Sequence, residues 1–196
     1  MCMKNYGCFA MPKLSDLGKC CAIITSLILF FAAPIVIADS RIQEIKFEYQ
    51  SIISALPSLR IEQAELSGYS TEGGSASAYR DTRGNIRFLK VELYGESGKV
   101  IEEYYLRNRQ LIFVYSVRYQ YNVPFYLTPE RSSEIGSEAF DSKKTTVHED
   151  RYYFDNHKLF RWINGEKKKI SPDSKEFKKA EKYLLSSFNE FIAKFE

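Results

Sequence analysis

The sequence predicts an α+β fold, a single antiparallel β-meander sheet with N- and C-terminal amphipathic helices packed on one face. The first observation is the stretch Ile86–Tyr121, where three apolar runs are separated by turn signals at Gly95–Gly98 and Asn108–Arg109. β-Branched and aromatic residues dominate these runs, as they do in strands. The second observation is a helical spacing of apolar residues on both sides of this region, within 41–56 and 173–195.

Each predicted helix has recognisable end signals. The N-terminal helix should begin near Asp39 or Ser40 as its N-cap and stop before Pro57. The C-terminal helix should begin at about Asp173. Their apolar stripes need a flat apolar surface, and the sheet is the element that offers one.

The strands follow from short β-rich runs bounded by turn residues. Residues 122–144 contain two prolines and little periodicity, which predicts a long loop excursion that is either disordered or functional. The predicted strands are Arg60–Leu66, Ala76–Arg80, Ile86–Tyr94, Val100–Leu106, Leu111–Tyr121, Thr145–Phe154 and Leu159–Ile163.

Side-chain alternation along these strands separates two faces. One face, which includes Leu89, Tyr104 and Phe113, is almost wholly apolar, and we expect both helices to cover it. The other face is polar but keeps aromatic and arginine side chains, the types enriched where partners bind. Coverage by the long loop or by a helix is the structural alternative. The residues predicted to bind a partner are Tyr105, Arg118, Arg151, Tyr153, Phe160 and Trp162.

The N-terminus carries the signature of an export signal. Lysines precede the apolar run Ala22–Ala38, which ends in small residues of the kind that signal peptidases read. We therefore expect residues 1–38 to be a cleaved signal peptide and residues 39–196 to form one α+β domain, with no stable membrane span after cleavage. A retained anchor is the alternative, and Met1, Met3 and Met11 are alternative starts.

The composition of the chain argues against several kinds of binding site. All four cysteines lie between Cys2 and Cys21, so an exported chain that starts at Asp39 would have no disulfide and no thiolate metal site, which favours a bacterial periplasm or another secreted location. The formal net charge is only +3 and the basic residues are not clustered, which argues against nucleic acid as a partner. Gly95–Lys99 lacks the spacing of a phosphate loop, and we predict neither a cofactor nor a metal.

An internal echo links two predicted hairpins. The segment Glu103–Val114 and the segment Arg151–Trp162 share the pattern Tyr-Tyr-apolar-x-Asn-x-x-Leu-apolar. Asn suits the first position of a two-residue type I′ turn, whose second position favours Gly. Arg109 and His157 occupy that second position, so each hairpin either uses a different turn or accepts strain.

These motifs carry a resemblance. The segments Tyr94–Lys99, Glu103–Val114 and Glu149–Trp162 resemble motifs of uncharacterised exported bacterial proteins with Tyr-Tyr-x-x-Asn-x-x-Leu β-hairpins. The missing turn glycines are the main departure from that pattern. The resemblance implies the fold and export, and no activity is known for the group. A looser similarity runs to repeat proteins built from related hairpins.

The sequence supports two hypotheses of function. The first is an exported, non-enzymatic binding protein that uses the polar sheet face, with residues 122–144 as a mobile flap, to bind another envelope protein or a small ligand. The alternative is a small envelope hydrolase with a site near His148 and Asp150, which alternation places on one side of a strand, with Glu149 on the other. The sequence leaves the ligand and the oligomeric state open.

Overall fold

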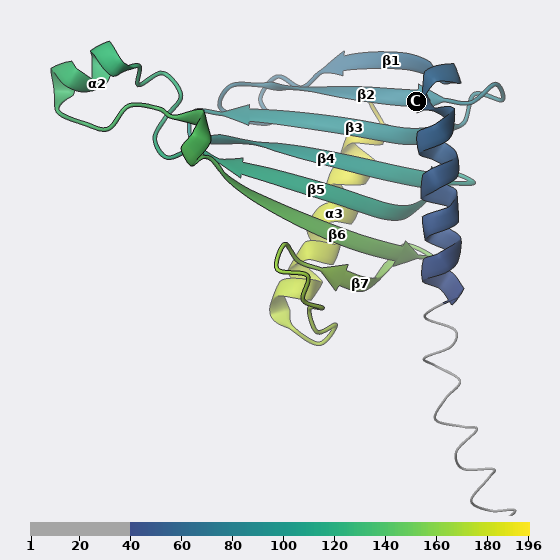
Figure 1. Ribbon diagram of the computed structural model, residues 1–196. Helices are drawn as coiled ribbons and strands as arrows, with labels where there is room; N and C mark the ends of the chain where they lie inside the picture. The colour runs from purple at the N-terminus through teal and green to yellow at the C-terminus, as the bar shows by residue number, and fades with distance from the viewer. Residues whose placement is uncertain (1–39) are drawn as a thin grey trace, which may run out of the picture. The chain divides into compact units, whose positions relative to one another are not determined.

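The structure is a computed structural model that describes residues 40–196 (Figure 1). The chain divides into two compact units, Met1–Gln43 and Glu44–Glu196. Of the first unit, only the helical residues 40–43 are described. The predicted signal peptide and its cysteines therefore lie outside the described residues, and the sheet belongs entirely to the second unit.

Seven antiparallel strands form one sheet in chain order, which confirms the α+β class and the meander. A first helix over residues 40–55 precedes the sheet and ends before Pro57, as expected from the fixed proline ring. The elements after it are η1 (Leu56–Ser58), β1 (Arg60–Glu65), β2 (Gly74–Arg80), β3 (Ile86–Gly95), β4 (Gly98–Arg107), β5 (Gln110–Gln120), α2 (Pro129–Ile135), η2 (Ser142–Lys144), β6 (Thr146–Asp155), β7 (Lys158–Ile163) and α3 (Lys175–Ile192).

The two long helices cover opposite faces of the sheet, so the expectation that both lie on one face is wrong (Figure 1). The larger core lies under α3, where Phe188 packs with Tyr104 at 5.8 Å between ring centroids. The first helix crosses the strands on the other face. Its Tyr49 ring lies 4.9 Å from Tyr105 and 5.8 Å from Phe113. We call these surfaces the α3 face and the first-helix face.

A β-bulge in β5 explains the error. Leu106 pairs with Leu111, but Tyr105 pairs with Phe113, which leaves Ile112 as an extra residue. An extra residue reverses the alternation of everything after it. As a result, Phe113 faces the first helix rather than α3.

The second hairpin repeats this bulge at the equivalent position of the echo. Phe154 pairs with Leu159, whereas Tyr153 pairs with Arg161, so Phe160 is the extra residue. Trp162 consequently lies opposite Tyr152 on the α3 face, not opposite Arg151. The echo between the hairpins therefore extends to their irregularities.

Both hairpins use the type I′ turn and keep the non-glycine second residue. The φ angles are 50° and 64° at Asn108 and Arg109, and 48° and 60° at Asn156 and His157. The hairpins therefore do not switch to a different turn type. They accept strain at Arg109 and His157 instead, since positive φ is unfavourable for residues with a Cβ.

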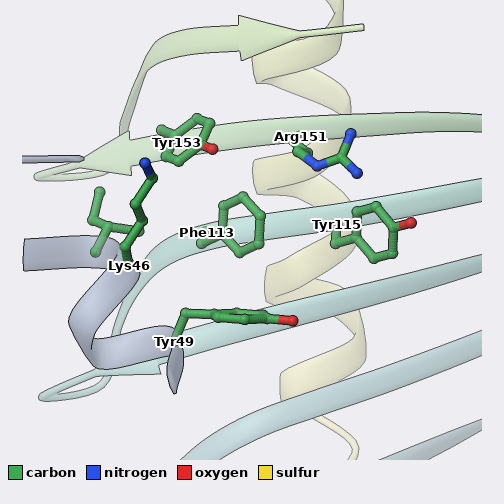
Figure 2. A pocket seen from close by; sticks show the side chains of 7 residues that line it. Lys46, Tyr49, Phe113, Tyr115, Arg151 and Tyr153 are labelled. Atoms are coloured by element: carbon green, nitrogen blue, oxygen red, sulfur yellow. The ribbon is translucent and has the colours of Figure 1, made fainter. Parts of the chain in front are cut away.

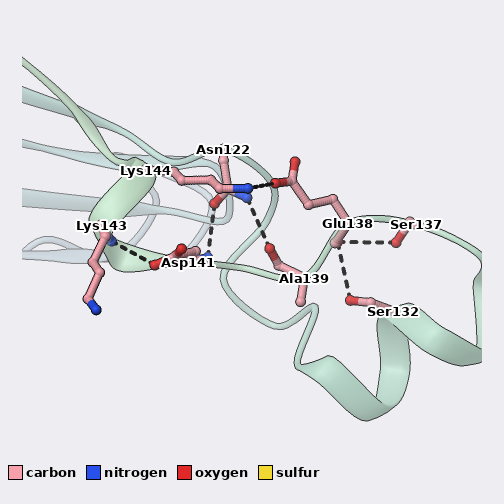
Figure 3. Close-up of polar contacts among 8 residues, drawn as sticks. All are labelled: Asn122, Ser132, Ser137, Glu138, Ala139, Asp141, Lys143 and Lys144. Carbon is pink, nitrogen blue, oxygen red and sulfur yellow. Dashed lines mark hydrogen bonds and ion pairs between the residues drawn. The ribbon is translucent and has the colours of Figure 1, made fainter.

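The segment 122–144 contains more structure than a loop. Thr128 caps α2 by accepting a hydrogen bond from the Arg131 amide, and Gly136 ends the helix at φ 66°. Asn122 ties the two ends of the segment together, since its side chain donates to the Ala139 carbonyl at 3.0 Å and accepts from the Asp141 amide at 3.1 Å (Figure 3). An ion pair between Lys144 and Glu138 lies beside these bonds.

The C-terminal helix starts one residue later than predicted. Ser174, rather than Asp173, is the N-cap of α3, and its hydroxyl accepts a hydrogen bond from the Phe177 amide at 3.1 Å. Within residues 40–196, none of the helices has the length and apolar character needed to cross a bilayer.

Candidate functional site

A cavity of about 330 Å³ lies where the first helix meets the open part of the first-helix face (Figure 2). Its walls come from one helix and two neighbouring strands, β5 and β6. We name this cavity the helix–sheet groove. The lining residues are Ile45, Lys46, Tyr49, Phe113, Tyr115, Arg151 and Tyr153.

Regular periodicities place these side chains together. Ile45 and Tyr49 are four residues apart, so they project from the same side of the helix. On the sheet, Phe113 pairs with Tyr153 across strands, and Tyr115 pairs with Arg151 one step further from the helix. Figure 2 shows these four side chains on neighbouring strands, with Lys46 and Tyr49 projecting from the helix.

Aromatic rings form a continuous wall. The Tyr49 and Phe113 rings meet edge to face at 5.8 Å, and Phe113 lies 5.0 Å from Tyr153. Such contacts add about 0.5–1.5 kcal/mol per pair to the burial of apolar area. The wall is therefore a rigid surface against which a flat apolar group can pack.

Two cations accompany the aromatic wall. Arg151 donates to the Glu149 carboxylate at 2.9 Å, and its guanidinium carbon lies 5.1 Å from the centre of the Tyr115 ring. Lys46 is exposed and makes no ion pair within residues 40–196. Two carboxylates lie beside these cations: Glu149, which pairs with Arg151, and Glu103, which lies opposite Tyr115 and accepts from the Tyr105 hydroxyl.

Tyr115 and Tyr153 stay protonated at neutral pH. Burial, followed by the hydrogen bond to Glu149, raises the pKa of Tyr115 to about 12. Burial also raises the pKa of Tyr153, although Arg151 and Arg161 act in the opposite direction. Neutral phenols can donate hydrogen bonds, so the groove offers donors as well as rings.

Four of the six predicted partner-binding residues gather here. Arg151 and Tyr153 line the groove, and the Phe160 ring lies 6.4 Å from Tyr153. Tyr105 lies beneath Tyr49, fully buried, and its hydroxyl donates to Glu103 at 2.8 Å. Tyr105 and Tyr153 share a face, as the echo predicts.

The other two predicted residues lie on the α3 face. Trp162 packs on Tyr152 at 5.2 Å and donates from Nε1 to Asp150 at 2.8 Å, which makes it part of a core layer rather than an exposed patch. Arg118 is exposed on that same face, opposite His148. Tyr105 and Tyr153 therefore lie on one face of the sheet and Trp162 on the other, so the predicted partner-binding residues do not form one surface.

Sequence reasoning missed the helix contribution and the β5 rings. Tyr49 belongs to the predicted helical stripe, but the stripe was expected on the other face, and Phe113 and Tyr115 were expected there too. Lys46 lies off the stripe. The bulge at Ile112 leaves no signature in the apolar pattern, because apolar residues stand on both sides of it.

The alternative site near His148 is not assembled. His148 and Asp150 lie on one face and Glu149 on the other, as alternation predicts. The Asp150 carboxylate accepts a hydrogen bond from Trp162, while the exposed imidazole of His148 makes no side-chain hydrogen bond within residues 40–196. A nucleophile and its base need mutual hydrogen-bond reach. Ser116, opposite Asp150, has no such contact with His148.

Residues 40–196 contain no group of three or more His, Cys, Asp or Glu side chains that could hold a metal ion. Comparisons with protein-family models, with curated proteins and with solved structures found no significant match to this chain. The geometry of the groove is therefore the feature that bears on function.

Proposed function

We propose that this protein is an exported, non-enzymatic binding protein whose ligand site is the helix–sheet groove. The observation that carries the proposal is the combination of an aromatic wall with Lys46 and Arg151 in one concave site. Small-ligand sites are typically concave and mostly apolar, with a few placed polar groups, and span about 300–1,000 Å³. The groove is at the lower end of that range.

The chemistry of the lining indicates the ligand class. Rings of Tyr49, Phe113 and Tyr153 favour a flat apolar group, and the two cations of the lining, Lys46 and Arg151, favour a carboxylate or a similar anion on that group. We therefore propose a small amphiphilic anion as the ligand. Export rests on the N-terminal apolar run, with cleavage after Ala38 in a bacterial envelope.

A fluorescence titration with anilinonaphthalene sulfonate, a flat aromatic anion, tests the site. We expect saturable binding that Arg151→Gln and Lys46→Gln each weaken about tenfold, as loss of one charged contact would. Arg118→Gln removes the same charge from the α3 face and should bind like the wild type. Equal weakening by all three variants, or no saturable binding, would reject the groove as the site.

N-terminal sequencing of the protein recovered from an expressing bacterial cell tests export separately. A chain that begins at Asp39 is the expected result. A chain that keeps residues before Ala22 in the membrane fraction would show a retained anchor instead.

A further inference from the structure

The end of the sheet that carries the Asn108–Arg109 turn holds a second cavity of about 540 Å³. It shares no residue with the helix–sheet groove. Its lining is mainly polar and unusually rich in arginine. The lining residues are Glu48, Asp81, Arg83, Asn85, Arg87, Arg107, Asn108 and Arg109.

The two carboxylates of this cavity already have partners. Glu48 forms an ion pair with Arg87. Asp81 accepts hydrogen bonds from the backbone amides of Arg83 and Asn85, each at 2.9 Å, so it is used to close its own turn. These two negative charges stand against the four guanidinium groups of the lining.

The lining contains four arginines, of which only Arg87 forms a close ion pair with one of the two acids. Arg107 has only a loose contact of 3.5 Å with Glu44, and both side chains are largely exposed. The side chains of Arg83 and Arg109 make no ion pair within residues 40–196. The cavity therefore has a local excess of positive charge, while the chain as a whole carries only +3.

Two irregular backbone positions bring arginines to this cavity. Arg109 stands at φ 64°, in a turn position that favours glycine. Arg87 is the extra residue of a bulge, because Tyr79 pairs with Phe88 and Arg80 pairs with Ile86. Strained and bulged residues concentrate at functional sites, where they aim a side chain.

We propose that this arginine-lined cavity binds a small oxyanion with two or more negative charges, of the phosphoryl class. The planar guanidinium fork matches phosphate geometry in a bidentate manner, which explains why arginine rather than lysine fills these positions. The amides of Asn85 and Asn108 add neutral hydrogen-bonding groups to the same lining. The ligand would sit apart from the amphiphilic anion of the groove.

Isothermal titration of the full chain with inorganic pyrophosphate at low ionic strength tests this proposal. Arg109→Gly should bind pyrophosphate about tenfold more weakly, and Arg83→Gln, which leaves the strained turn intact, should behave alike. His157→Gly is the matched control, because it relaxes the equivalent turn without touching this cavity. Arg118→Gln controls for loss of one positive charge elsewhere.

Three outcomes would overturn the proposal. The first is the absence of saturable pyrophosphate binding, and the second is equal weakening by Arg83→Gln and Arg118→Gln, which would show a nonspecific charge effect. The third is sedimentation with phosphatidylglycerol vesicles that depends on Arg109 in a protein that does not bind pyrophosphate, which would assign the arginines to a lipid surface. Each result is independent of anilinonaphthalene sulfonate binding in the groove.

Discussion

At the scale of single residues, Glu102 is the one charged side chain that is buried among residues 40–196. It lies on the α3 face with 3% of its surface exposed, and it accepts a hydrogen bond from the Tyr104 hydroxyl. Burial raises the pKa of the Glu102 carboxyl above its ordinary value, although hydrogen bonds from Tyr104 and Tyr183 and the charge of Arg118 oppose the shift. The folded protein therefore favours the protonated carboxyl.

This shift predicts a stability that falls as the pH rises. The folded state keeps the Glu102 proton to a higher pH than the unfolded state, so the stabilisation is complete below the ordinary carboxyl pKa of 4.5 and is lost through the raised value. The slope from one such group is at most about 1.4 kcal/mol per pH unit.

We expect the free energy of unfolding, measured in urea melts at a series of pH values above 4.5, to fall less steeply with pH for Glu102→Gln than for the wild type. Glu190→Gln, which removes an exposed carboxylate of α3, should keep the wild-type slope. Parallel curves for Glu102→Gln and the wild type would show that Glu102 ionises normally in the fold.

The two strained turn residues give a second prediction at this scale. Arg109 and His157 hold φ angles of 64° and 60°, which cost about 1 kcal/mol for a residue with a Cβ. Arg109→Gly and His157→Gly should therefore each raise the free energy of unfolding by about that amount, as measured in urea. A loss of stability in both variants would mean that the side-chain contacts outweigh the strain.

At the scale of elements, the strands and the faces differ in how well the sequence predicts them. Every predicted strand exists, with ends within two residues, because turn residues and β-rich runs are local signals. The face on which a side chain lies is not set by local signals, because it depends on every bulge that precedes it in the strand. One extra residue at Ile112 and another at Phe160 reverse the alternation, and neither has a sequence signal of its own.

The same bulges explain why the site was predicted only in part. The predicted set assumed unbroken alternation after Leu111, so it placed Phe113 and Tyr115 in the core and Trp162 at the surface. Arg151 and Tyr153 were placed correctly because they precede the second bulge. The helix residues Lys46 and Tyr49 could not be found, since the sequence does not show which face a helix covers.

Opposite placement of the two helices predicts independent energetics. Tyr49→Ala removes contacts with Tyr105 and Phe113, whereas Phe188→Ala removes contacts on the α3 face with Tyr104. Because the two side chains share no partner, their effects on the free energy of unfolding should add within about 0.5 kcal/mol in a double-mutant cycle. A coupling well above that value would indicate that the helices pack on a common face.

At the scale of the Glu44–Glu196 unit, the main core and the proposed binding site lie on opposite faces of the sheet. The α3 face holds the main core, which includes Leu89, Tyr104 and Leu184. The first helix covers only part of the other face, and the groove at its edge is the consequence. The proposed binding function therefore depends on which face each helix covers.

An NMR titration with anilinonaphthalene sulfonate, observed through the aromatic carbons of labelled tyrosine and tryptophan, tests that dependence most directly. Binding in the groove should shift the signals of Tyr49, Tyr115 and Tyr153 together with one dissociation constant, and should leave those of Tyr104, Tyr152 and Trp162 on the α3 face unchanged. Shifts confined to Tyr152 and Trp162 would contradict the proposed site, because they would place the ligand on the opposite face of the sheet.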